Sequence, residues 1–123
     1  MFTLPVGDLL ASYTGDSKVF SFSGHVFDGY YDDLIFKKEL SFHIKLIALD
    51  DGIEGHFTDL HTRVKYENIT TDVSLESFER IWKLKPTKND PDDIKPINKK
   101  DMTIDIGEVI REEIIMYCCN ENL

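Results

Sequence analysis

The sequence lacks several features that mark common classes of protein. It has no apolar run of about 18 residues, and its opening, Met1-Phe2-Thr3-Leu4-Pro5, lacks the basic region and long apolar stretch of a signal peptide. We therefore expect a cytoplasmic protein that does not contact a membrane. Its two cysteines, Cys118 and Cys119, are adjacent, so they can neither link distant segments nor form a metal knuckle by themselves. Both are expected to be reduced thiols.

Recognisable motifs for catalysis and metal binding are also missing. The sequence contains no nucleophile elbow, no GxxxxGK[ST] phosphate loop and no GxGxxG stretch. The histidines, at positions 25, 43, 56 and 61, show no zinc-ligand spacing, and His56 and His61 are expected on opposite faces of one strand. Adjacent carboxylate pairs are frequent, but neighbouring side chains point apart and suit solvated turns. We expect no enzymatic activity, no metal and no cofactor.

The chain is acidic, with 14 basic and 23 acidic side chains and a formal net charge of −9 in 123 residues. This charge favours solubility and repels phosphate, so nonspecific electrostatic binding to nucleic acid is disfavoured. The distribution is uneven, because residues 80–100 carry seven basic and three acidic side chains between two acidic blocks. The length and the 41% hydrophobic content suit a single folded domain, residues 1–123.

Alternation of apolar and polar residues predicts a sheet through most of the chain. Strands are expected at residues 18–26, 34–36, 40–48, 53–67 and 69–75. Short turns between them predict antiparallel pairing, and Gly55 is expected to mark a bulge. In the fourth strand, the pattern places His56 and Thr58 on the same face as Leu60. A short helix is expected within residues 5–13, and the proline-punctuated residues 86–100 are expected to form a loop.

Residues 74–85 allow two interpretations. Ser74 can cap a helix with Leu75, Phe78 and Trp82 on one side, or the strand can continue through an irregular turn into residues 81–84. We favour the strand and turn.

The carboxyl-terminal segment has the clearest pattern in the sequence. Asp105 suits an N-cap, and Glu108 is placed to complete a capping box, so a helix is expected over residues 105–118. Its apolar face consists of Ile106, Val109, Ile110, Ile114 and Tyr117. Its polar face consists of Glu108, Arg111, Glu112 and Glu113. We therefore predict an α+β domain: a mainly antiparallel sheet, open or barrel-like, with a short N-terminal helix and this amphipathic helix packed on it.

Aromatic and basic side chains interleave in the segment from Phe78 to Lys85. This combination can stack bases and contact a phosphate backbone. Alternatively, Phe78 and Trp82 belong to the core while the basic residues keep a sheet edge soluble. The candidate RNA- or partner-binding residues are Phe78, Arg80, Trp82, Lys83, Lys85 and Lys88.

Three segments have a familiar layout: residues 4–10 (LPVGDLL), residues 73–76 (VSLE) before a short knuckle and an acidic loop, and, most specifically, residues 104–115. In these the chain resembles the YceD-type family, the large ribosomal RNA subunit accumulation proteins. Members often carry a Cys-x-x-Cys pair where this chain has Ser77 and Arg80, which excludes a metal knuckle there. Many members also continue further beyond the final helix.

The resemblance implies a non-enzymatic factor in the biogenesis of the large ribosomal subunit. The resemblance does not indicate whether such a factor contacts RNA or a ribosomal protein. Because the net charge is −9, we expect the main partner to be a basic ribosomal or ribosome-assembly protein, with large-subunit rRNA as a further contact. The alternative is a generic protein–protein adaptor that uses an open sheet edge for strand addition.

Overall fold

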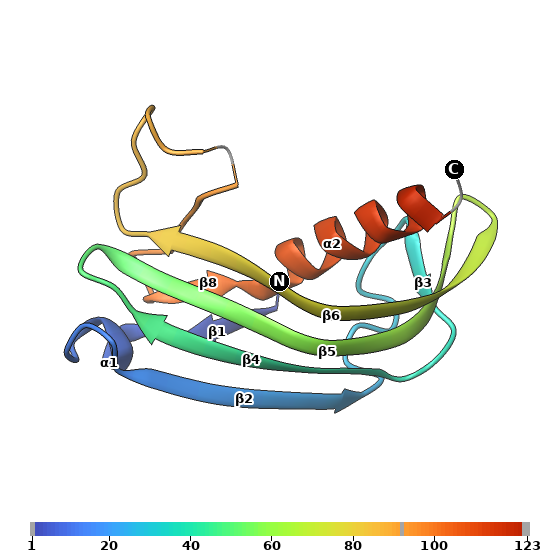
Figure 1. Cartoon of the computed structure of the whole chain (residues 1–123), viewed down its shortest axis with the longest axis horizontal. Helices are drawn as coiled ribbons and strands as arrows, with labels where there is room; N and C mark the ends of the chain where they lie inside the picture. Colours follow the sequence, from blue (N-terminus) through green and yellow to red (C-terminus); the bar gives the residue numbers. More distant parts are fainter. Residues whose placement is uncertain (1, 92, 122–123) are drawn as a thin grey trace.

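The chain folds as a curved sheet with one long helix packed against it (Figure 1). The structure is a computed structural model that describes residues 2–91 and 93–121. In chain order the elements are β1 (Thr3–Pro5), α1 (Gly7–Leu10), β2 (Ser17–Gly24), β3 (Leu34–Phe36), β4 (Leu40–Ala48), β5 (Gly52–Tyr66), β6 (Ile69–Lys83), β7 (Lys95–Pro96), β8 (Thr103–Asp105) and α2 (Ile106–Glu121).

The main sheet has the strand order β2-β4-β5-β6-β7, and β3 pairs with the far end of β5. The pairs β4–β5 and β5–β6 are antiparallel, as the short turns predicted. The pair β2–β4 is also antiparallel, although β3 lies between these two strands in the chain. The α+β class is confirmed. The sheet is open rather than barrel-like, because β2 and β7 stand at the two ends of this order without pairing with each other.

The core lies between α2 and the sheet face that we call the inner face. Strand β4 turns Leu40, Phe42, Ile44 and Leu46 inward, and each is at most 1% exposed. Helix α2 meets them with the predicted apolar stripe: Ile106, Val109, Ile110 and Ile114 are buried, joined by Cys118, while Tyr117 is only partly buried. A stripe of this width at helical spacing is what buries a helix against a sheet, so the predicted packing is confirmed.

The start of α2 is held by contacts with Phe2, Lys95 and Asp105. The Asp105 carboxylate accepts a hydrogen bond from the Glu108 amide at 3.3 Å, which confirms the predicted N-cap. The Glu108 carboxylate accepts one from Lys95 at 3.2 Å. The Phe2 carbonyl accepts from the Ile106 amide at 3.1 Å, next to the antiparallel pair of β1 and β8, a strand that the sequence did not predict. The Gly107 amide also donates to the Phe2 carbonyl, at 3.4 Å, so the amides of Ile106, Gly107 and Glu108 all have partners.

An irregularity in β5 reverses the side-chain pattern along that strand. Ser41 pairs with His61, but His43 pairs with Thr58, so β5 holds an extra residue at this point, and Asp59 has a φ of 52°. One extra residue shifts the two-residue period by one. Phe57 and Leu60 both point inward, whereas His56 and His61 both lie on the opposite side, which we call the outer face. Two predictions are wrong for this reason: that His56 and Thr58 share a face with Leu60, and that His56 and His61 lie on opposite faces.

The predicted bulge at Gly55 is also wrong, because Gly55 pairs regularly with Leu46 and Arg80. What the position requires is space. A Cβ atom on Gly55 would lie 2.8 Å from Cζ3 of Trp82, closer than side chains normally approach. The absence of a side chain therefore lets the indole ring cover the backbone of β5.

Strand β6 continues without interruption to Lys83. Of the two interpretations of residues 74–85, the strand is therefore correct and the helix is wrong. The irregular turn that we expected within this strand is absent. The predicted loop at 86–100 contains β7, which runs parallel to β6 with Trp82 opposite Lys95. This pair is an exception to the predicted antiparallel arrangement. Pro96 is tolerated in it because the pair is short and lies at the end of the sheet.

The β5–β6 hairpin turns through Glu67 and Asn68, whose φ values are 51° and 66°. Two successive residues with positive φ suit a type I′ turn, for which Asn-Gly is the preferred sequence. Changing Glu67→Asn together with Asn68→Gly is expected to raise the free energy of unfolding by about 1 kcal/mol, since both replacements relieve strain. Urea unfolding would measure the gain. Glu67→Ala, which removes the charge but keeps the strain, is the control and should give no such increase.

Candidate functional site

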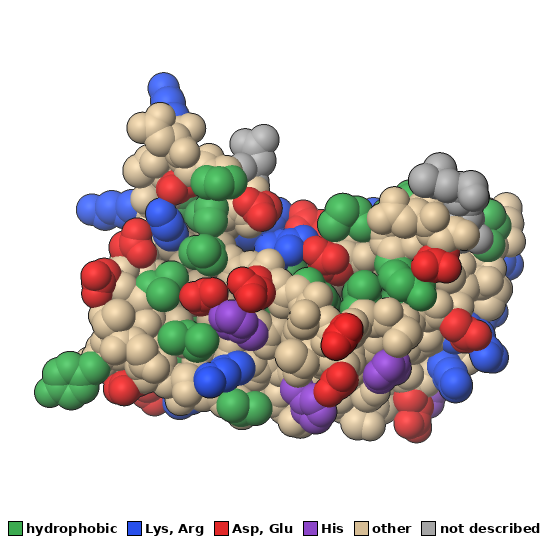
Figure 2. All heavy atoms as spheres, in the orientation of Figure 1, with side chains coloured by type: hydrophobic (Ala, Val, Ile, Leu, Met, Phe, Trp, Pro, Cys, Tyr) green, Lys and Arg blue, Asp and Glu red, His purple; other side chains and the backbone are tan. Residues whose placement is uncertain are grey.

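Polar side chains line up across the outer face of the sheet. The pairing places Ser23, Ser41, His61 and Ser74 in one row over four neighbouring strands. The Ser74 hydroxyl lies 3.2 Å from Nδ1 of His61. In the next row, the Ser21 hydroxyl lies 2.6 Å from Nδ1 of His43. Figure 2 shows histidine side chains interspersed with acidic ones over this surface. The outer face thus offers hydroxyl and imidazole groups for hydrogen bonding.

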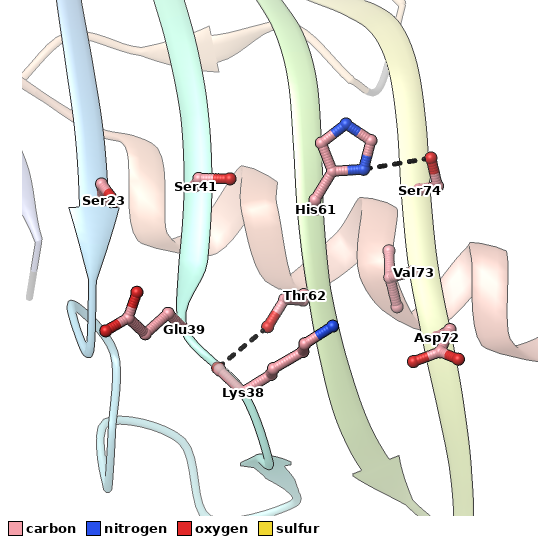
Figure 3. Close-up of a pocket in the computed structure, with 9 residues that line it drawn as sticks. All are labelled: Ser23, Lys38, Glu39, Ser41, His61, Thr62, Asp72, Val73 and Ser74. Atoms are coloured by element: carbon pink, nitrogen blue, oxygen red, sulfur yellow. Dashed lines mark hydrogen bonds between the residues drawn. The ribbon is translucent and has the colours of Figure 1, made fainter.

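A pocket of about 630 Å³ opens on the outer face, where β3 and β4 separate along the edge of β5. Phe36 pairs with Val64 and Ser41 with His61, so residues 37–40 stand opposite only two residues of β5. Figure 3 shows the lining residues distributed over neighbouring strands, with α2 passing behind the sheet. The lining residues are Ser23, Lys38, Glu39, Ser41, His61, Thr62, Asp72, Val73 and Ser74.

The charges around this pocket are mixed. Arg63 donates a hydrogen bond to Asp72 at 2.6 Å, and this bond holds the pKa of the Asp72 carboxyl below its usual range. Lys38 and Glu39 supply one charge of each sign. Among the described residues, the contacts of His61 and His43 include a serine hydroxyl but no carboxylate to orient the ring. The serine–histidine pairs therefore lack the third member of a nucleophilic triad.

Three of the candidate RNA-binding residues lie on the inner face. Trp82 is 1% exposed. Phe78 is partly buried and stacks on Phe57, with ring centroids 4.5 Å apart. Arg80 forms an ion pair with Glu113 of α2, and only 11% of its side chain is exposed. Their burial agrees with the alternative in which the aromatic residues of this segment belong to the core. Glu113 accordingly faces the sheet and not the polar side of α2 where we expected it.

The other three candidates lie elsewhere. Lys83 donates to Asp90 at 2.8 Å and lies 3.5 Å from Asp51, contacts that raise the pKa of its ammonium. Lys85 and Lys88 follow the end of β6 and are exposed. The six residues are therefore divided between the core, an ion pair and a loop, and they do not form one continuous surface. Direct RNA contact by this set stays a prediction.

The pattern of the sequence does not indicate which strand carries an open edge. Strand β2 ends the sheet, and among the described residues no strand pairs with its outward side. The Ala48 amide donates to the Asp16 carbonyl at 2.8 Å, which fixes the alternation along β2. Lys18, Phe20 and Phe22 then direct their backbone groups at β4. The residues between them direct theirs outward: Ser17, Val19, Ser21 and Ser23.

The two edges of the sheet differ in how they are protected. Strand β6 carries Asp72, Glu76 and Glu79, and its last residues are covered by β7. Strand β2 carries one charged residue, Lys18, whose ammonium lies 3.9 Å from Asp8. Its Val19 side chain is 65% exposed. Exposed edges are normally protected by charges, prolines or bulges, and β2 has little of this protection.

Comparisons with protein-family models, curated proteins and solved structures yield no match to this chain. Neither helix in residues 2–91 and 93–121 has the length and apolar character needed to cross a membrane. A function for this chain therefore has to be inferred from the α+β fold, in particular from the open edge of β2 and the polar outer face of the sheet.

Proposed function

We propose that this chain is a non-enzymatic binding module that accepts an extended segment of a basic partner protein beside β2. The observation that carries the proposal is the row of outward backbone groups on Ser17, Val19, Ser21 and Ser23, along an eight-residue strand with one charged side chain. An added strand gains main-chain hydrogen bonds, while side-chain contacts on alternate positions provide specificity.

Side chains beside this edge indicate what the added strand should contain. Phe20 and Phe22 point toward the inner face and are only partly buried, and Phe22 packs edge-on against Phe2 at 5.6 Å between ring centroids. Every second residue of the added strand would cover these rings and should be apolar. The net charge of −9 favours lysine or arginine at the alternate positions.

A synthetic peptide with these properties provides the direct test. The probe is a peptide of about ten residues, the upper end of the usual range of strand lengths, in which valine and lysine alternate. Its binding is expected to protect the amides of Val19, Ser21 and Ser23 from hydrogen exchange, since these amides acquire a carbonyl partner. The same peptide with glutamate in place of lysine is expected to bind more weakly. Protection confined to β6 would contradict the proposal.

The strongest test on the protein is Ser21→Pro. The Ser21 amide points away from β4, so proline at this position does not break the β2–β4 ladder. The proline does remove one outward hydrogen-bond donor, and its ring obstructs an incoming strand. We expect peptide affinity to fall at least about tenfold, equivalent to about 1.4 kcal/mol. Titration followed by NMR would measure it. Ser21→Ala, which loses the same hydroxyl but keeps the amide, is the matched control.

A second variant guards against a folding defect in the first. Val19→Lys leaves the backbone unchanged and places a charge on the edge, which opposes strand addition in natural sheets. Both variants should retain the thermal midpoint of the parent within a few degrees. A folded Ser21→Pro or Val19→Lys protein with unchanged peptide affinity would refute binding at β2.

The role in large-subunit biogenesis is a narrower proposal and is supported only by the resemblance in sequence. It would make the basic partner a ribosomal or ribosome-assembly protein, with large-subunit rRNA as a further contact. Sedimentation of a lysate tests it, since the chain should then migrate with pre-ribosomal particles. Replacement of Lys85 and Lys88 with glutamate tests the RNA contact without disturbing buried residues.

A further inference from the structure

Three side chains of metal-ligand type converge on the outer face. Nε2 of His56 lies 2.9 Å from a carboxylate oxygen of Glu54, and Nδ1 lies 3.4 Å from one of Glu79. One ligand atom from each residue can be chosen so that all three lie within 4.8 Å of one another. Two ligand atoms on one Zn²⁺ ion lie roughly 3–3.5 Å apart, so three atoms within 4.8 Å of one another are close to the spacing that a shared ion requires.

Strand geometry produces this convergence. Glu54 and His56 are two residues apart on β5 and share the outer face, and Glu79 is paired directly with His56 from β6. The pairing of β5 with β6 keeps the same register on both sides of Asp59, so His56 stays opposite Glu79. In the neighbouring row, Ile47 and Ile81 are paired with Glu54 on either side, and the Glu54 side chain is 27% exposed. A partly desolvated carboxylate next to an imidazole gains from a cation.

The other histidine with two acidic neighbours is a useful contrast. His25 lies 2.9 Å from Asp28 and 4.0 Å from Glu39, but the three side chains are 62%, 48% and 65% exposed. His56 is 34% exposed, and its two carboxylates come from β5 and β6, two strands in fixed register. The nearest basic residue in the same row is Lys45, paired with His56 on β4. The positive charge of Lys45 repels a bound cation, so the attraction of the two carboxylates for the ion has to exceed this repulsion.

We propose that Glu54, His56 and Glu79 bind a divalent transition-metal ion of the Zn²⁺ type, through one imidazole nitrogen and two carboxylate oxygens. In the structure Glu79 lies at Nδ1 and Glu54 at Nε2, so metal binding requires the Glu79 side chain, which is 62% exposed, to rotate toward Nε2. Water would complete a tetrahedral shell. A site with an imidazole nitrogen among its ligands favours such an ion over Mg²⁺ and Ca²⁺, which prefer oxygen ligands only. The site is separate from the β2 edge, so neither proposal depends on the other.

Titration of the whole chain with ZnCl₂ tests the site, by calorimetry and by NMR of the histidine rings. Zn²⁺ should shift the ring resonances of His56 first, and excess Ca²⁺ should not displace it. We expect His56→Ala to weaken binding more than about tenfold and Glu79→Gln to weaken it severalfold, since each removes or neutralises a ligand. His25→Ala is the matched control and should leave the affinity unchanged. Lys45→Gln should strengthen binding by removing a repelling charge.

Two results would overturn the proposal. One is a Zn²⁺ affinity that survives both His56→Ala and Glu79→Gln in folded protein. The other is a first ring shift at His25, His43 or His61, which would indicate binding to scattered surface histidines. Both variants lie on the outer face, away from the buried core, so circular dichroism should confirm that they fold.

Discussion

Trp82→Ala is expected to lower the free energy of unfolding by about 3–5 kcal/mol, the usual cost of removing a large buried aromatic side chain. The indole is 1% exposed, and its ring centroid lies 6.5 Å from that of Phe57. Its removal leaves a cavity at the end of the sheet where β5, β6 and β7 meet. Trp82 is the only tryptophan, so urea unfolding should be followed by circular dichroism and not by fluorescence.

A matched control separates burial from aromatic character. Tyr13 is 86% exposed, and Tyr13→Ala should change stability by less than about 0.5 kcal/mol. The two interpretations of the segment 78–85 also diverge here. If Trp82 stacked on RNA bases, its replacement would reduce RNA binding and spare the fold. A stable, fully folded Trp82→Ala protein would contradict the core assignment.

The close approach of Trp82 to Gly55 adds a second, coupled test. Gly55→Ala alone would place a Cβ atom 2.8 Å from the indole, and overpacking of this kind costs about 1–3 kcal/mol. In the Trp82→Ala background the same methyl group enters the cavity and should be tolerated or stabilising. Non-additivity of the two changes would show that the glycine is required by the ring and not by the backbone.

Local patterns account for the parts of the fold that the sequence predicted well. The capping residue Asp105 and the apolar stripe of α2 are separated by a few residues, so their spacing is fixed by helix geometry alone. The hairpins of β4, β5 and β6 likewise follow from alternation and short turns. Such features need no knowledge of what the segment packs against.

The parts that were predicted wrongly depend on pairing between distant segments. Asp59 adopts a positive φ, which aspartate tolerates better than most residues, but an aspartate at one position of an alternating run is also typical of a regular solvent-facing strand residue. The sequence therefore did not indicate the irregularity that reverses the faces of β5. The spacing of Glu54 and His56 was visible, but Glu79 joins them only through the β5–β6 register. The open edge at β2 follows from β3 pairing with β5, an arrangement that alternation cannot reveal.

The Arg80–Glu113 ion pair provides the second large effect. It joins β6 to α2, with side chains only 11% and 13% exposed. Removing one partner leaves a poorly hydrated charge at the interface, so Arg80→Met or Glu113→Leu alone is expected to cost about 3 kcal/mol. The exposed pair of Arg111 and Asp33, at 41% and 43%, is the control, and Asp33→Asn should cost less than about 1 kcal/mol.

Replacing both members of the buried pair should restore most of the stability lost by either. Nε of Arg80 is buried among the described residues without a hydrogen-bond partner, so the native pair does not fully compensate its own desolvation. Arg80→Met combined with Glu113→Leu is therefore expected within about 1 kcal/mol of the parent, which a double-mutant cycle of urea unfolding would measure. Additive losses would contradict this, and would mean that each residue is held by other contacts. Because Arg80 supports the helix, charge reversal at this position would report on folding, and tests of RNA binding should use Lys85 and Lys88 in its place.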